Sequence, residues 1–231
     1  MGASTPFTYR DIFFSRQRLY SLAGGLTLLV VSFIVEHFAV LYALSYATRS
    51  TTVYVGDLLL DNLPVVNLNL IIVDGALWAI VLSTLLVLWN PRKILFALKV
   101  VALTIAIRAF FMSLTHIGIY PGQINPGHGL YGSLYTYLDL QTGYFFSGHT
   151  AFPFLMVLFF WEKRMWRYTY LALTVVFAAS VLLAHVHYSI DVFAAPFIAY
   201  GIFEISRKLF PQDYSLLSAE TVTNETVSSS R

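Results

Sequence analysis

The stretch YTYLALTVVFAASVLLAHVHYSIDVFAAPFIAYGIFEIS, residues 168–206, is an apolar run with one polar interruption near its middle. Its 39 residues are too many for one membrane crossing, because about 20 residues span the hydrocarbon core of a bilayer. The interruption, HVHYSID at 185–191, contains two histidines and an aspartate. The run therefore predicts two membrane-spanning helices, 168–187 and 189–206, joined by a turn that carries reactive side chains.

The composition of the whole chain is that of a membrane protein. Of its 231 residues, 58% are hydrophobic and only 11% are charged, and the mean hydropathy is +0.70. An average soluble domain has about 25% charged residues. The net charge of +2 is too small to indicate a nucleic-acid partner, and the absence of cysteine excludes disulfides and thiol chemistry. We expect an integral, multi-pass protein whose partner is the lipid bilayer.

The remaining apolar runs extend this prediction to six spans. They are 21–46, 66–89, 94–117, 145–161, 168–187 and 189–206. The expected fold class is thus all-α, a bundle of six transmembrane helices. We expect the chain to divide into an N-terminal segment (1–20), the six-span domain (21–208) and a tail without structure (209–231), because the tail is polar and rich in serine.

Positive charges between the spans predict their orientation. Ten cations fall on one side of the predicted bundle, and only Arg49 lies in the opposing loops. The ten are Arg10, Arg16, Arg18, Arg92, Lys93, Lys163, Arg164, Arg167, Arg207 and Lys208. Because lysine and arginine accumulate in cytoplasmic loops, we expect both termini in the cytoplasm. The SGHT motif at 147–150 and the HVHYSID turn then lie together on the outer side.

The two motifs contain the residue types that phosphoryl transfer needs. Neutral imidazole can attack phosphorus, and histidine transfers protons near neutral pH. We expect His187 to be the nucleophile, with Asp191, four residues later, orienting its ring. His149 is the candidate proton donor to the leaving oxygen. Ser147 and the amides of Gly148 and His149 stand at a predicted helix start, where phosphate oxygens can bind.

These motifs resemble those of a known family. SGHT followed by LLAHVHYSIDV resembles the second and third motifs of the type 2 phosphatidic acid phosphatase superfamily, and most closely its sphingomyelin synthase branch. The segments 107–121 and 56–64 resemble that branch more weakly, so the likeness covers roughly 56–208. It implies six spans, an outer or lumenal active site and a phosphohistidine at His187. It also implies Asp191 as its partner, His149 as proton donor, and no metal or other cofactor.

The chain departs from the family patterns at two positions, and the second concerns the acceptor. The classical phosphatases carry an arginine where this chain has Val181, a loss that the synthase branch shares. That branch has an aspartate six residues before its first catalytic histidine, where this chain has Gly143. The nearest upstream acid is Asp139, a possible accessory residue. The acceptor that resolves the phosphohistidine therefore stays open between water and a lipid hydroxyl.

Other polar residues within the spans have two interpretations each. Glu36, Asp74 and Arg108 are predicted at similar depth, where Arg108 either pairs with Asp74, aided by Glu36, or binds the substrate phosphate. His185 is either an accessory to His187 or a loop histidine, and we favour the loop. His149, His187 and Asp191 as three metal ligands fit the motif pattern less well than phosphoryl transfer does.

The sequence thus predicts an enzyme that acts on a lipid. The hypothesis is transfer or hydrolysis of a phospholipid headgroup, with phospholipids and lipid alcohols of the diacylglycerol or ceramide type as substrates. The alternative reaction is dephosphorylation of a lipid phosphate. Two other classes are a lipid-binding relative without turnover, and a transporter that uses Glu36, Asp74 and Arg108 as an ion path. No internal duplication of the kind seen in many transporters is evident.

Overall fold

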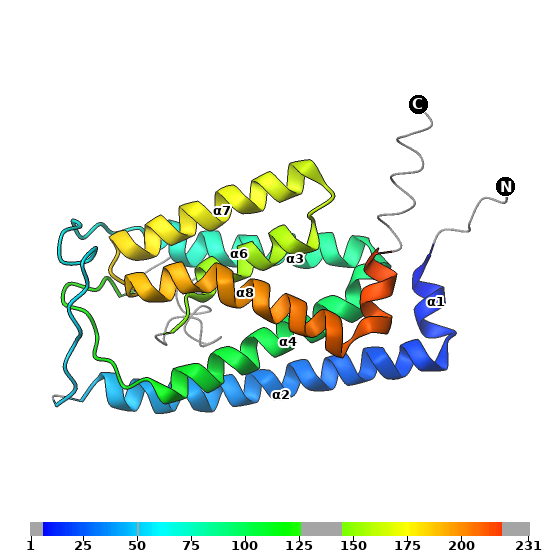
Figure 1. Cartoon of the computed structure of the whole chain (residues 1–231), viewed down its shortest axis with the longest axis horizontal. Helices are drawn as coiled ribbons and strands as arrows, with labels where there is room; N and C mark the ends of the chain where they lie inside the picture. The colour runs from blue at the N-terminus through cyan, green and yellow to red at the C-terminus, as the bar shows by residue number, and fades with distance from the viewer. Residues whose placement is uncertain (1–6, 50, 126–144, 219–231) are drawn as a thin grey trace.

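The computed structural model describes residues 7–49, 51–125 and 145–218, which form a helical bundle without strands in these ranges (Figure 1). In chain order the elements are α1 (Tyr9–Phe13), α2 (Arg16–Ala47), η1 (Leu70–Gly75), α3 (Ala76–Trp89), α4 (Pro91–Leu114), α6 (Gly148–Phe159), α7 (Arg164–Leu183) and α8 (Ser189–Leu209). η1 is a single stretch of π-helix that continues directly into α3. The expected all-α class is confirmed for the described residues.

Within these ranges, five helical segments are long and apolar enough to cross a membrane. They are α2, the continuous η1 and α3, α4, α7 and α8. They coincide with five of the six predicted spans, although α2 begins at Arg16 rather than residue 21, and η1 begins at Leu70 rather than residue 66. The start of α4 shows how the sequence sets such a boundary. The Asn90 side chain accepts a hydrogen bond from the Arg92 amide, and Pro91 occupies the first helical position.

The fourth predicted span, 145–161, differs from expectation. Its helix, α6, contains only 12 residues, which gives a length of about 18 Å against the roughly 30 Å of a bilayer core. Most of α6 is buried by the other helices rather than exposed to lipid. Because neighbouring protein can satisfy irregular backbone at membrane depth, a buried segment does not need to remain helical over the full thickness.

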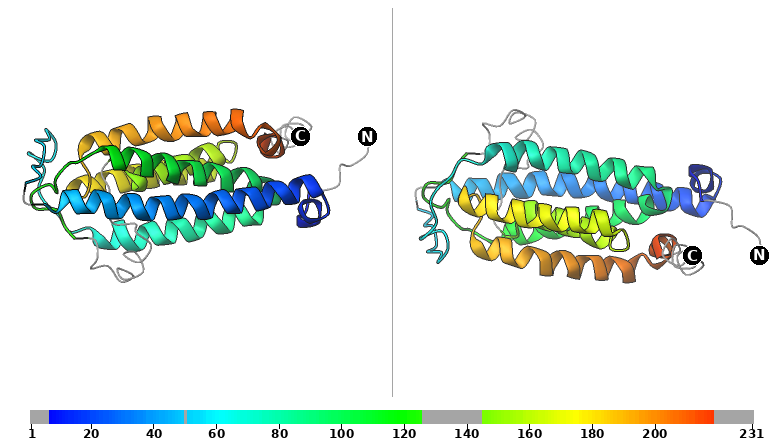
Figure 2. Two further views of the ribbon diagram at one scale, coloured as in Figure 1. Left: turned by 90° about the horizontal axis from the view of Figure 1, so that it is seen from below. Right: turned by 90° about the horizontal axis from the view of Figure 1, so that it is seen from above.

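The helices alternate in direction along the bundle. α2, α4 and α7 run toward one end, and α3, α6 and α8 run back toward the end where α1 lies (Figures 1 and 2). The ten cations grouped by sequence belong to α1, the start of α2, the junctions before α4 and α7, and the end of α8. They therefore gather at the α1 end. The two histidine motifs lie at the starts of α6 and α8, in the opposite half of the bundle.

The start of the C-terminal tail is ordered, contrary to the expectation for 209–231. Residues 211–218 are helical, and Asp213 forms a buried ion pair with Lys99 of α4. Ser21 of α2 donates to the Asp213 carboxylate at 2.7 Å and accepts from Lys99 Nζ at 2.8 Å. These contacts tie the segment to the bundle. Residues 219–231 lie outside the described residues.

Residues 51–69 and 115–125, here called the loop layer, cover the other end of the bundle (Figure 1). Val66 and Ile124 donate their amides to the carbonyls of Leu183 and Ala184 at the end of α7, at 2.8 and 3.0 Å. Within the layer, Gly118 lies so close to Val53 that an added Cβ would be 3.0 Å from its carbonyl carbon. Backbone contact therefore fixes the layer on the helix ends that carry His187.

Candidate functional site

His187 and Asp191 form a local pair at the start of α8. His187 lies in the turn after α7, and Asp191 is the third residue of α8. His187 Nδ1 is 3.4 Å from Asp191 Oδ2, and the two residues are 5% and 1% exposed. The same carboxylate accepts the Tyr188 amide at 3.2 Å. This arrangement leaves the Nε2 atom of His187 as the ring nitrogen directed away from the aspartate.

Asp191 also holds the segment that precedes α6. Its Oδ1 accepts the Phe145 amide at 3.1 Å, and its backbone carbonyl accepts the Ser147 amide at 3.0 Å. Phe145 has a φ of +64°, in the left-handed region, so the chain turns sharply just before the helix. One aspartate therefore connects the two motifs, which are about 40 residues apart in the sequence.

His149, the second residue of α6, lies close to His187. The two ring centroids are 6.0 Å apart. His149 Nε2 is 3.2 Å from the backbone carbonyl oxygen of Ile72 in η1. Short π-helical segments are frequent at functional sites, and this one places a carbonyl against the imidazole. The two rings predicted to share a substrate are thus brought together, each with one ring nitrogen near an acceptor oxygen.

Arg108 forms an ion pair with Glu36, which the sequence offered only as an aid to a pair of Arg108 with Asp74. Its Nη1 atom forms an ion pair with Glu36 Oε1, with both side chains 13% exposed. Its Nε atom donates to the Phe146 carbonyl at 3.3 Å. Asp74 is 4% exposed and belongs to η1. The sequence predicts how deep a residue lies along its span. The direction of its side chain depends on helix rotation, which brings Glu36 to Arg108.

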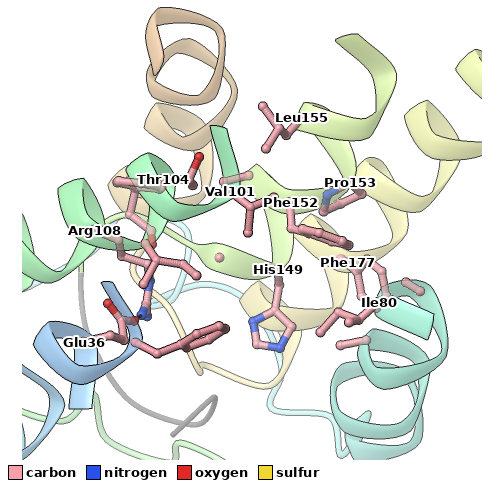
Figure 3. A pocket seen from close by; sticks show the side chains of 17 residues that line it. Glu36, Ile80, Val101, Thr104, Arg108, His149, Phe152, Pro153, Leu155 and Phe177 are labelled. Carbon is pink, nitrogen blue, oxygen red and sulfur yellow. Dashed lines mark hydrogen bonds and ion pairs between the residues drawn. The ribbon is translucent and has the colours of Figure 1, made fainter. Parts of the chain in front are cut away.

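A cavity of about 240 Å³ lies beside these residues, between α2, α3, α4, α6 and α7. Glu36, Arg108 and His149 supply its charged and titratable lining, and most of the remaining wall is apolar, including Phe152 and Phe177. Figure 3 shows Glu36 next to Arg108, and the His149 ring on the side toward Phe177. The described lining includes His149 but not His187. A polar end joined to an apolar wall suits an amphiphilic ligand.

Other predicted residues take varied positions. Gly148 lines the cavity, and a Cβ there would be 3.6 Å from Arg108 Nε. Ser147 is fully buried, accepts a hydrogen bond from Thr150 at 3.3 Å and is not among the residues that line the cavity, so its phosphate contact stays a prediction. His185 packs on Tyr120 with Nδ1 3.5 Å from the Pro121 carbonyl, as a loop histidine would. Asp139 lies outside the described residues.

Asp57 is a supporting residue in the segment 56–64, whose weak family resemblance predicted no role for it. Its carboxylate accepts the Ser189 amide at 2.7 Å, at the first residue of α8, and the Leu59 and Leu60 amides at 3.0 and 3.2 Å. Burial raises the pKa of Asp57, but these hydrogen bonds, led by that of Ser189, outweigh burial and hold the pKa below its usual range. Asp57 thus fixes the helix start that bears Asp191.

Tyrosines strengthen the same part of the loop layer. The Tyr188 hydroxyl donates to the Gly118 carbonyl at 2.9 Å and accepts the Val55 amide at 3.3 Å. Tyr120 donates to Asp61, and that hydrogen bond raises the pKa of Tyr120 to about 12. Among the described residues, no group of three His, Cys, Asp or Glu side chains has the geometry of a metal site.

Together these features define a class: a helical protein with the spans of a multi-pass membrane protein and a paired-histidine site beside an amphiphilic cavity. The family model described as PAP2 superfamily C-terminal matches residues 142–208, a range that contains both histidine motifs. Over this range the chain is similar to the PAP2 superfamily, which includes phosphatases. No curated protein and no solved structure matches the chain.

Proposed function

We propose that the protein is a membrane enzyme that transfers or hydrolyses the phosphorylated headgroup of a phospholipid, similar to the sphingomyelin synthase branch of the PAP2 superfamily. One observation carries the proposal: the imidazoles of His149 and His187 lie 6.0 Å apart, with His187 backed by Asp191 and His149 lining the cavity. The family match adds support for lipid phosphate chemistry.

The reaction has two steps. In the first, His187 Nε2 attacks phosphorus, so an N–P bond forms and the P–O bond to the lipid alcohol breaks. Asp191 holds Nδ1 and stabilises the cation that develops on the ring. His149 gives its proton to the departing oxygen. In the second step, an acceptor hydroxyl attacks phosphorus, His149 takes the acceptor's proton, and the N–P bond breaks to restore His187.

Arg108 and Gly148 are the proposed phosphate contacts. Both line the cavity next to His149, and the guanidinium offers the planar pair of donors that suits phosphate oxygens. The apolar wall beyond them would receive hydrocarbon from the lipid. Asp74 and Asp139 stay accessory candidates. The proposed catalytic domain is 21–208, and the proposed chemistry requires no metal or cofactor.

The proposed topology has six passages, with both termini in the cytoplasm and the site on the extracytoplasmic or lumenal side. The alternating direction of the helices supports this arrangement, because α6 runs opposite to α4 and α7. The gathering of ten cations at the α1 end supports the orientation. Labelling of single introduced cysteines, one at Ser15 and one at Val55, by an impermeant reagent on intact cells is the test. Labelling only at Val55 is expected, and labelling at Ser15 would reverse the proposed orientation.

Turnover of a fluorescent phospholipid by purified protein in detergent tests the function. We expect release of a phosphorylated headgroup, and loss of release in His187→Ala and Asp191→Asn. His116→Ala is the matched control, because His116 is an exposed histidine outside the site and packs on Tyr46. Turnover that survives both site changes would refute the assigned roles. Solute flux into liposomes without lipid cleavage would favour a transporter, and lipid binding alone would favour a relative without turnover.

A second candidate reaction is dephosphorylation of a lipid phosphate, which the PAP2 match favours. Product identification by mass spectrometry separates the reactions. Inorganic phosphate from a lipid phosphate monoester indicates a phosphatase. A released phosphorylated headgroup indicates hydrolysis of the phospholipase C type, and a new phospholipid formed when ceramide is added indicates a transferase.

A further inference from the structure

The ion pair between Glu36 and Arg108 lies in the wall of the cavity that receives His149. Glu36 comes from the middle of α2 and Arg108 from α4, 72 residues later. Both side chains are mostly buried, and both line the cavity. Charged groups at such depth face the interior of a bundle and mark functional positions more often than structural ones.

Helix packing alone does not account for this pair. α2 and α4 already pack closely through Gly25, where an added Cβ would be 3.3 Å from Leu98 Cβ. A cluster of buried small and apolar residues, including Ala39 and Ala109, joins the same two helices nearer the site. Because removing two charges from water offsets much of their attraction, a buried ion pair adds little to such an interface. A role inside the cavity explains the pair better.

Arg108 is held at the start of α6 by further contacts. Its Nε atom donates to the Phe146 carbonyl, and the Gly148 backbone lies against it with no side chain between. The guanidinium is therefore kept beside His149, where a substrate phosphate is expected. Glu36 adds one negative charge at the same place. Among the described lining residues, the charges of Glu36 and Arg108 cancel, so the proton that His149 donates is the remaining positive charge in the proposed reaction.

The charges of Glu36 and Arg108 together affect phosphate monoesters and phosphate diesters differently. A phosphate monoester carries a charge of about −1.5 to −2 at pH 7 because its second pKa is about 6, whereas a diester carries a single negative charge. We propose that Glu36 is a specificity-determining residue that fits the cavity to a singly charged phosphodiester and disfavours a doubly charged monoester by repulsion. This inference rests on the proposed lipid phosphotransfer. Selection by a repulsive group is a common route to specificity.

Two probes with the same leaving group provide the test: a short-chain diacylglycerol phosphate and its methyl diester. Diacylglycerol release is measured for both with full-length protein in detergent. Wild type is expected to prefer the diester. Glu36→Gln should raise the ratio of monoester to diester kcat/KM by about tenfold or more, because one unit charge at close range is removed. Glu36→Asp keeps the charge and should keep the diester preference.

Glu204→Gln is the matched control, since Glu204 also pairs with an arginine of a helix but lies at the other end of the bundle. Its substrate ratio should equal that of wild type. Thermal unfolding in detergent shows whether each variant is folded. A folded Glu36→Gln protein with an unchanged ratio overturns the inference. Failure of wild type to cleave either probe would instead refute the proposed function on which the inference rests.

A measurement on wild type alone covers the case in which Glu36→Gln does not fold. The monoester is used as a competitive inhibitor of diester cleavage between pH 5.5 and 8. Its inhibition should weaken as the pH rises through about 6, where it loses its second proton. The diester does not titrate in this pH range, so the pH dependence of its KM corrects for changes in the protein. Inhibition that stays constant or strengthens after this correction overturns the inference.

Discussion

The two histidines of the candidate site are held by different kinds of contact. His187 depends on its own neighbourhood in the sequence, because Asp191 is four residues away and also accepts the Tyr188 amide. His149 instead meets the Ile72 carbonyl, 77 residues away, and shares its cavity wall with Arg108. The comparison teaches that a short motif specifies one half of the site, whereas helix packing assembles the other. Changes at a distance should therefore affect the two halves differently.

The largest expected effect separates the chemical roles of the two rings. His187→Ala should reduce kcat/KM by about 10⁴-fold or more, as loss of a nucleophile does. His149→Ala should cost about 10²- to 10⁴-fold, as loss of a general acid does. With a substrate whose leaving group needs no proton, His149→Ala should still form an acid-labile phosphohistidine, and His187→Ala should not. Rapid-quench labelling measures the intermediate. Label retained in His187→Ala would reverse the assignment.

Arg108→Lys tests the half of the site that packing assembles. Lysine keeps the charge but loses the planar pair of donors, so the phosphate contact and the hydrogen bond to Phe146 cannot both form. We expect kcat/KM to fall by about 10- to 100-fold, mainly through KM. Lys99→Arg, at a second buried ion pair of α4, is the control and should leave KM unchanged. A KM equal to wild type in Arg108→Lys would remove Arg108 from the phosphate site.

Asp57→Asn weakens the hydrogen bond that holds the start of α8, next to the His187–Asp191 pair. The Ser189 amide loses a charged acceptor, which is expected to lower the free energy of unfolding by about 1–3 kcal/mol. The pKa of Asp57 is lowered on folding, so its contribution is present above the usual carboxyl pKa of about 3.9 and is lost as the pH falls toward the folded value. Unfolding in detergent at pH 7 and pH 3 measures this. If the free energy of unfolding of Asp57→Asn differs from that of wild type by the same amount at both pH values, the prediction is contradicted.

The smallest expected effect is that of Tyr120→Phe, which removes the hydrogen bond to Asp61 in the loop layer. The pKa of Tyr120 is raised to about 12. The contribution should therefore be complete below the usual tyrosine pKa of about 10 and disappear as the pH rises toward 12. Thermal unfolding of both proteins between pH 8 and 12 tests this sign. A difference in unfolding temperature between the two proteins that widens with pH would show that the hydrogen bond stabilises the phenolate instead.

Much of the fold was predictable from length and composition. Apolar runs predicted the helices α2, α3, α4, α7 and α8, because a bilayer requires about 20 apolar residues per crossing. The short α6 was not predictable in this way, since its length depends on burial among other helices. The helical segment 211–218 was missed for a related reason: its polar sequence is stabilised by the buried pair of Asp213 with Lys99.

The sequence by itself determined the class of the protein, five of its long apolar spans and the local pair His187–Asp191, because hydropathy and a four-residue spacing act within a single segment. Tertiary structure alone decided that Arg108 meets Glu36, that Ile72 faces His149, and that Asp57 holds the start of α8. These partners are separated by 72, 77 and 132 residues. These contacts depend on the rotation and depth of whole helices. Packing sets both, and a local sequence pattern does not predict them.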